Sequence, residues 1–180
     1  MKQGLVFWFT GLSGSGKTTI AEGVKPLLVE KGYSVLILDG DDVRERLHVN
    51  LGFSPEDIKK NNFLIAKLCK QSRFNYDVVL VPIISPYLCS RSEARDLLGD
   101  GFYEIYFATD LETVMQRDVK GLYKKAKNNE IKNMIGFSPG NIYEPPSHPD
   151  FVVASDEDTA ENSISKFYQF VLHKVNSSEI

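Results

Sequence analysis

Residues 5–19 read LVFWFTGLSGSGKTT, and this stretch decides the fold class. The first six residues are apolar apart from a final threonine, which predicts a strand buried on both faces of a sheet. Residues 11–18 match the pattern G-x-x-x-x-G-K-[ST], and a helical pattern begins at Lys17. A strand, a glycine-rich loop and a helix in this order form the context in which the pattern binds phosphate. We therefore predict a phosphate-binding loop after the first strand.

The residue types in this loop suit a nucleoside triphosphate. Glycines let backbone N–H groups turn toward the phosphates, and the amino end of the following helix adds a favourable dipole. Lys17 would neutralise the β- and γ-phosphates, and the hydroxyl of Thr18 would hold Mg²⁺. The alternative is a glycine-rich turn with a chance lysine, which leaves the flanking strand and helix unexplained. The sequence thus predicts that the chain binds a nucleoside triphosphate.

Short apolar runs alternate with helical patterns along the 180 residues, which predicts a parallel α/β sheet within one domain, residues 1–180. Five strands are expected, at residues 5–10, 34–38, 78–84, 104–108 and 151–154. The helices are expected to begin at Lys17, at Pro55, near Ser90, at Leu111 and near Asp156. Ser155 and Asp158 resemble a capping box for the last helix, and Pro26 should kink the first one.

Composition argues against several classes of protein. The 21 basic and 24 acidic residues give a net charge of −3, which provides no electrostatic footprint for nucleic acid or for a membrane. No apolar run reaches the roughly 18 residues that span a bilayer. Cys69 and Cys89 fit no metal-ligand spacing and are expected to be reduced, mostly packed thiols of a cytoplasmic protein. His48, His148 and His173 are isolated and are expected at the surface or in packing.

A cluster of acidic residues follows the second strand. The run VLILDGDDVR places Asp39, Asp41 and Asp42 at its carboxyl end, and Arg44 follows them. Ligands of open parallel sheets bind beyond the carboxyl ends of the strands. A carboxylate there can orient water bound to Mg²⁺ or accept the proton of an attacking hydroxyl. A simple Asp-Gly turn is the alternative, and it explains three acids followed by an arginine poorly.

Two further segments lie where a substrate would bind. The third strand leads into ISPY, residues 84–87, where Ser85 could donate to a substrate oxygen, although most Ser-Pro pairs only form turns. Residues 120–149 begin with KGLYKKAK and show weak periodicity, and so long a connection is typical of a lid or of a disordered segment. As a lid, its lysines would meet phosphates while Leu122 and Tyr123 cover a base or ribose. A solvated basic face is the ordinary alternative.

Taken in order, the phosphate-binding loop, LDGDDVR, LGFSPED, ISPY and KGLYKKA resemble the adenylylsulfate (APS) kinase family. The resemblance covers the chain from about residue 5 to about residue 149. It implies a P-loop kinase fold and ATP-dependent, Mg²⁺-assisted phosphorylation of a ribose 3′-hydroxyl, which gives 3′-phosphoadenylylsulfate (PAPS) in the usual case. The partner would be a small nucleotide, and a homodimer is a candidate assembly because dimers are common in that family.

The same resemblance assigns roles to individual residues. Asp41 and Lys17 would be catalytic, and Thr18 and Asp41 would hold the metal. ATP would be bound by Gly11, Ser13, Gly14, Ser15, Gly16, Lys17, Thr18 and Thr19. The substrate would be bound by Asp39, Arg44, Phe53, Ile58, Asn61, Ile84, Ser85, Lys120 and Leu122. An aromatic clamp on the substrate base would correspond to residues 137–143.

The chain departs from the family's pattern on the substrate side. Where the family reads EDR-x-EN-x-RR, this chain has Ile58, Phe63 and Leu64, so three arginines are absent while Asn61 remains. Loss of one charge-assisted hydrogen bond weakens binding roughly ten- to a hundredfold. The acceptor is therefore either APS or a related nucleotide with a less anionic terminal group, such as the cytidine diphosphoramidate of capsule-modification pathways.

Asn61 and Asn62 fall in the middle of a predicted helix, where asparagine competes with the backbone for hydrogen bonds. Asn61 matches a substrate position of the family, and Asn62 is expected to face solvent or a neighbouring loop.

Two other functions remain open. A non-catalytic nucleotide switch conflicts with the intact Lys17, Thr18 and Asp41. A P-loop kinase for a sugar or a shikimate-like acid leaves KGLYKKA unexplained.

Overall fold

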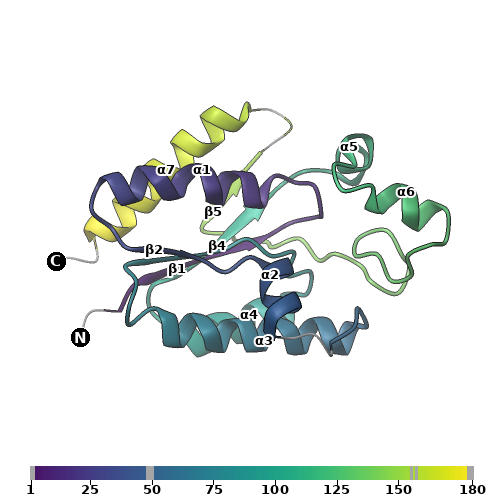
Figure 1. Cartoon of the computed structure of the whole chain (residues 1–180), viewed down its shortest axis with the longest axis horizontal. Helices are drawn as coiled ribbons and strands as arrows, with labels where there is room; N and C mark the ends of the chain where they lie inside the picture. Colours follow the sequence, from purple (N-terminus) through teal and green to yellow (C-terminus); the bar gives the residue numbers. More distant parts are fainter. Residues whose placement is uncertain (1–2, 48–50, 155, 157, 178–180) are drawn as a thin grey trace.

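Five parallel strands form one sheet with the order β2-β3-β1-β4-β5 (Figure 1). The computed structural model describes residues 3–47, 51–154, 156 and 158–177. The strands are β1 (Leu5–Thr10), β2 (Val35–Ile37), β3 (Val78–Val81), β4 (Phe102–Phe107) and β5 (Phe151–Val153). β1 lies in the middle, between β3 and β4. All of its residues are buried, as predicted for a strand covered on both faces.

Helices cover both faces of this sheet. They are α1 (Lys17–Glu30), α2 (Gly40–Leu47), α3 (Pro55–Ser72), α4 (Leu88–Leu98), α5 (Leu111–Arg117), α6 (Leu122–Lys127) and α7 (Ala160–Ser177). Figure 1 shows α1 and α7 on one face, α2, α3 and α4 on the other, and α5 and α6 beyond the carboxyl end of the sheet. The predicted α/β fold class is therefore confirmed. No helix in the described part of the chain is long and apolar enough to cross a membrane.

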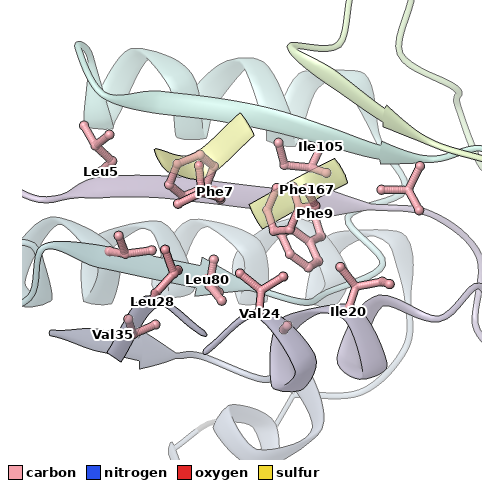
Figure 2. Close-up of a cluster of buried hydrophobic side chains, with 14 of the residues drawn as sticks. Leu5, Phe7, Phe9, Ile20, Val24, Leu28, Val35, Leu80, Ile105 and Phe167 are labelled. Carbon is pink, nitrogen blue, oxygen red and sulfur yellow. The ribbon is translucent and has the colours of Figure 1, made fainter. Parts of the chain in front are cut away.

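The alternation of side chains along β1 divides the core into two layers. Phe7 and Phe9 face α1 and α7, and Figure 2 shows them beside Phe167, with ring centroids 5.9 Å and 5.3 Å from its own. Val6 and Trp8 face the opposite side and pack with residues of α3 and α4. The sheet is thus held between two apolar layers, and the carboxyl ends of its strands form one edge.

Prolines lie at one element boundary that departs from the prediction and inside one helix. β3 ends at Val81 rather than at residue 84, because Pro82 has no N–H to donate to a neighbouring strand. Pro26, in contrast, does not end α1, which continues to Glu30. Pro26 is exposed, so its ring lies on the outer side of the helix.

Helices α2 and α6 were not predicted, and α7 begins later than predicted. Residues 40–47, for which no helix was predicted, are helical, and the carboxylate of Asp39 accepts a hydrogen bond from the N–H of Asp41 at 2.9 Å at the start of α2. α7 begins at Ala160 rather than near residue 156, and the hydroxyl of Thr159 accepts from the N–H of Asn162 at 3.2 Å. The predicted cap at Ser155 lies outside the described residues.

Both cysteines are free thiols. Cys69 is buried, as predicted, but Cys89 is exposed in the first turn of α4, so the prediction of packing was wrong for it. His148 and His173 are exposed, and His48 lies outside the described residues.

Candidate active site

A cavity of about 600 Å³ lies at the carboxyl edge of the sheet. The phosphate-binding loop, the junction of β2 and α2, helix α3, the turn after β3 and residues 119–135 all contribute to its wall. It brings together most of the predicted site residues, namely Ser13, Gly14, Gly16, Lys17, Thr18, Thr19, Asp39, Asp41, Arg44, Phe53, Ile58, Asn61, Ile84, Ser85, Lys120 and Leu122. Gly11 and Ser15 do not line it and instead contact the side chain of Lys17.

The phosphate-binding loop depends on glycine at two positions. Gly14 and Gly16 have φ angles of 79° and 91°, in the left-handed region that other residues rarely adopt. Gly16 directly precedes α1, so the first N–H groups of this helix are available to a ligand. The Nζ of Lys17 donates to the carbonyls of Gly11 at 2.9 Å and Leu12 at 2.6 Å. Burial lowers the pKa of Lys17 to about 7.

Thr18 and Asp39 form a pair that suits a divalent cation. The hydroxyl of Thr18 donates to Oδ2 of Asp39 at 3.0 Å, at the wall of the cavity. Hydroxyl and carboxylate oxygens are ligands that Mg²⁺ takes together with substrate phosphates. The described residues contain no group of three or more acidic, histidine or cysteine side chains that could hold a metal. Mg²⁺ bound at such a pair commonly takes further ligands from water and from phosphate oxygens.

Asp41 lies in the first turn of α2, and its carboxylate contacts Lys120, just before α6, rather than Thr18. The Nζ of Lys120 donates to Oδ2 of Asp41 at 2.6 Å, and the two side chains are 55% and 79% exposed. This hydrogen bond raises the pKa of Lys120. The carboxylate of Asp41 is thus accessible from the cavity. Asp42 is exposed and does not line the cavity.

Arg44 and Phe53 form one stacked unit. The guanidinium carbon of Arg44 lies 4.5 Å from the centre of the Phe53 ring, and its NH1 donates to the carbonyls of Leu51 and Gly52 at 3.0 Å and 2.7 Å. Phe53 is still 55% exposed. An exposed aromatic ring beside a phosphate-binding loop is suited to stacking on a planar base.

Ile58 belongs to an apolar wall of the cavity. It is 3% exposed and packs with Tyr87 and Ile135, and Ile84 packs against the same cluster. Asn61, one turn later on α3, is also buried and lines the cavity. The position at which the resembled family has an arginine therefore contacts apolar groups in this chain.

Asn62 is buried as well, which corrects the prediction that it faces solvent or a loop. It is 3% exposed, it lines the cavity, and its Nδ2 donates to the hydroxyl oxygen of Ser85 at 3.1 Å. Asn62 follows Ile58 by four residues and precedes Ile65 by three, so it shares a helix face with two buried apolar residues. That spacing was the sequence signal for its burial.

The 120–149 segment packs onto the phosphate-binding loop. The hydroxyl of Tyr123, in α6, donates to the carbonyl of Ser13 at 3.0 Å, and Tyr123 shares an apolar cluster with Leu12. Gly136 has a φ of 76°, and a Cβ added there would lie 2.3 Å from the side chain of Leu12. The positive φ favours glycine here, and a larger residue would also have to displace the side chain of Leu12.

The same segment reaches the cavity through residues 131–135, which the sequence did not indicate. Met134 and Ile135 supply apolar surface there, and Lys132 supplies a cation. Phe137 and Tyr143, from the region predicted to clamp the base, do not line the cavity. Weak periodicity in this region gave no sign of which residues face inward.

The phosphate-binding loop at the end of β1, the Thr18–Asp39 pair and the cavity beyond them define a P-loop kinase. The chain belongs to the adenylylsulphate kinase family, whose model matches residues 3–154. It is 46% identical to an adenylyl-sulfate kinase of Halothermothrix orenii over 177 residues, which cover 96% of this chain and 92% of that protein. It is 42% identical to an adenylyl-sulfate kinase of Clostridium kluyveri, with 97% and 86% covered.

A solved structure agrees with this assignment. The Mycobacterium tuberculosis APS kinase in complex with AMPPNP and APS matches the chain with a TM-score of 0.85 and 36% identity, over 96% of this chain and 99% of that one. The chain is therefore an ATP-dependent kinase, and the family resemblance predicted from the motifs is confirmed.

Proposed function

We propose that the chain transfers the γ-phosphoryl group of ATP to the ribose 3′-hydroxyl of APS, which yields PAPS and ADP. The observation that carries this proposal is the position of Asp41, which is exposed in the same cavity as the phosphate-binding loop and Asn61. A carboxylate there can accept the proton of a substrate hydroxyl that faces the terminal phosphate of ATP. The similarity to curated adenylyl-sulfate kinases supports APS as the substrate.

ATP would bind to residues 11–19. Lys17 would leave the carbonyls that it now contacts and turn to the β- and γ-phosphates, whose charge it would offset. Thr18 and Asp39 would hold Mg²⁺, since these two side chains are in contact. This replaces Asp41 by Asp39 in the predicted ligand pair. The cation would neutralise charge on the phosphate oxygens when bound.

Transfer would proceed by in-line attack of the 3′-oxygen on the γ-phosphorus. The new O–P bond forms as the bond between that phosphorus and the β–γ bridging oxygen breaks, and ADP leaves with the bond electrons. Asp41 would accept the hydroxyl proton and later release it to water. Lys120, which contacts Asp41, would exchange this carboxylate for phosphate oxygens of the bound substrates.

The nucleotide substrate would lie between α3, the turn after β3 and the 120–149 segment. The exposed ring of Phe53 would stack on its base, and Arg44 and Asn61 would contact its polar groups. Ile84, Ser85 and Leu122 would complete the wall.

Cytidine diphosphoramidate is the second candidate acceptor. The observation that favours it is the apolar cluster of Ile58, Tyr87 and Ile135, because Ile58 and Ile135 line the cavity and Ile58 presents no cation to a terminal sulfate at its position. The transfer chemistry would be the same, because both molecules present a ribose 3′-hydroxyl. Identities of 40% and above to adenylyl-sulfate kinases favour APS.

A turnover screen tests these assignments. The purified chain is supplied with ATP and Mg²⁺ and with APS, cytidine diphosphoramidate, AMP or CDP in turn, and both ADP and the phosphorylated nucleotide are measured. We expect ADP release that depends on APS, with PAPS as product. If only the cytidine compound is phosphorylated, it and not APS is the substrate. ADP release that does not depend on any nucleotide acceptor would contradict the assignment as a nucleotide kinase.

A further inference from the structure

Ser85 is fixed from several directions in the turn after β3. Its φ of 43° lies in the left-handed region, and the residue is 2% exposed. Its carbonyl accepts hydrogen bonds from the hydroxyl of Thr10 at 3.0 Å and from NH1 of Arg91 at 2.7 Å. Arg91 is buried and held in turn by an ion pair with Glu104 at 2.6 Å. These contacts stabilise a backbone conformation that serine rarely adopts, and they fix the direction of its side chain.

Two donors also fill the acceptor capacity of the Ser85 hydroxyl. Nε1 of Trp8 donates to its oxygen at 2.9 Å, and Nδ2 of Asn62 donates at 3.1 Å. An indole N–H and an amide NH₂ can only donate, whereas a hydroxyl has two acceptor positions and one hydrogen. Both acceptor positions of Ser85 are therefore occupied, and its hydrogen must find an acceptor elsewhere.

That acceptor is not supplied by the described part of the chain. No described residue accepts a hydrogen bond from the Ser85 hydroxyl, while Ser85 and Asn62 both line the cavity beside Asn61. We propose that Asn62 and Trp8 are positioning residues that make the Ser85 hydroxyl an obligate hydrogen-bond donor to the nucleotide substrate. The atom that it recognises is an oxygen without a hydrogen, such as an oxyanion oxygen of the phosphoryl anhydride. This inference rests on the proposed binding of a nucleotide in the cavity.

An obligate donor contributes to selectivity in a way that an ordinary serine does not. A free hydroxyl can rotate to accept from an N–H group or to donate to an oxygen, so it tolerates both. With both acceptor positions filled, Ser85 binds an oxygen and leaves a hydrogen-bearing nitrogen without a partner. The cavity would therefore disfavour a substrate that presents an amide nitrogen at this point.

The variant Asn62→Asp tests the proposal, because aspartate has a similar shape but can only accept. The hydrogen of Ser85 would then turn to the new carboxylate and be lost to the substrate. We expect the KM for the nucleotide substrate to rise roughly ten- to a hundredfold, as for a lost hydrogen bond to a charged group. The KM for ATP should stay unchanged. Asn62→Leu, which removes the donor and adds no acceptor, should raise the substrate KM less.

Repulsion between the new carboxylate and an anionic substrate could mimic this result, so the decisive measurement is a double-mutant cycle. If Asn62 acts through Ser85, Asn62→Asp should have little further effect on substrate affinity in a Ser85→Ala background. An equal loss of affinity in both backgrounds would overturn the proposal. The midpoint of thermal unfolding of each variant shows whether a loss of affinity comes only from unfolding. If Asn62→Asp does not fold, Asn62→Leu and Trp8→Phe each remove one donor and free one acceptor position of Ser85. The smaller loss of affinity that each of them causes should then disappear in the Ser85→Ala background.

The cycle is measured as binding of the nucleotide that the wild-type chain phosphorylates in the turnover screen. If that nucleotide is not APS, the proposed function is wrong in its substrate, yet the cycle still tests Ser85. If APS is turned over and the cycle is additive, the proposed function stands and the role of Asn62 and Trp8 is refuted.

Discussion

The Nζ of Lys120 lies 2.6 Å from Oδ2 of Asp41, so the start of the 120–149 segment contacts the first turn of α2. Both side chains are more than half exposed, and exposed ion pairs typically contribute at most about 1 kcal/mol. The contact can therefore separate at little cost when substrates enter. It brings a cation and a carboxylate together in the cavity, where our proposed function has the phosphoryl group transferred.

Asp41→Asn is the first prediction. Asparagine keeps the shape of the side chain but cannot accept the proton of the 3′-hydroxyl, so kcat should fall by about 10²- to 10⁴-fold. ATP affinity, measured by calorimetry, should change little, because the phosphate-binding loop is untouched. Asp42→Asn is the matched control: its carboxylate is exposed outside the cavity, and near wild-type turnover is expected. Near-normal turnover of Asp41→Asn would defeat the catalytic assignment.

The low pKa of Lys17 predicts a pH dependence of ATP binding. Burial lowers this pKa to about 7, and phosphate oxygens in the complex would raise it. Above about pH 7, Lys17 should therefore take up a proton when ATP binds. Below about pH 7, Lys17 is already protonated and the affinity for ATP should be at its maximum. It should fall as pH rises, by up to about tenfold per pH unit, until the pKa of the complex is reached.

Calorimetry between about pH 7.5 and pH 9 checks this, because the terminal phosphate of ATP ionises near pH 6 and is constant in that range. Repeating the titration in two buffers of different ionisation enthalpy counts the protons taken up. Lys17→Met should bind ATP more weakly and show a flat profile. A flat wild-type profile would mean that Lys17 is already charged in the free protein.

Ile58→Arg tests the substrate side of the cavity. Ile58 contacts Tyr87 and Ile135 at the cavity wall, and an arginine there could extend its guanidinium toward an anionic substrate. We expect the KM for APS to fall about tenfold, the lower end of the effect of a hydrogen bond to a charged group. Ile58→Met, similar in length without the charge, should leave this KM nearly unchanged. An unchanged KM in a folded Ile58→Arg variant would show that the absence of this arginine does not weaken APS binding in this chain.

The sequence was sufficient where structure is decided by neighbouring residues. The strand, loop and helix of residues 5–19 follow from local pattern and from the φ angles that Gly14 and Gly16 allow. The same holds for α3, where the hydroxyl of Ser54 accepts from the N–H of Asp57 at 3.1 Å, as its cap pattern predicted.

The rest depends on contacts between distant parts of the chain. Trp8 and Ser85 are 77 residues apart, and neither residue type signals their hydrogen bond. Asn62 was predicted to face solvent or a neighbouring loop, although its spacing from Ile58 and Ile65 puts it on the buried face of the helix. Residues 131–135 have no regular periodicity, so only their packing on the phosphate-binding loop decides which of them reach the cavity.

Asn141 gives the last prediction, because it joins three segments around the cavity from a fully buried position. Its Oδ1 accepts from the hydroxyl of Tyr87 at 2.9 Å, and its Nδ2 donates to the carbonyls of Phe53 at 2.9 Å and Asn133 at 2.7 Å. Asn141→Leu has a similar volume and removes all of these bonds. The free energy of unfolding should fall by about 2–5 kcal/mol, because each buried polar group left unpaired costs about 1–3 kcal/mol.

The KM for the nucleotide substrate should also rise in Asn141→Leu, since the backbone of Phe53 loses its anchor, while the KM for ATP should not. Tyr87→Phe is the control: it removes only the bond to Oδ1 and leaves Phe53 held, so a loss of about 1–2 kcal/mol with little change in KM is expected. Urea unfolding and steady-state kinetics measure both effects. A destabilised Asn141→Leu variant with an unchanged substrate KM would show that Asn141 supports the fold without positioning Phe53.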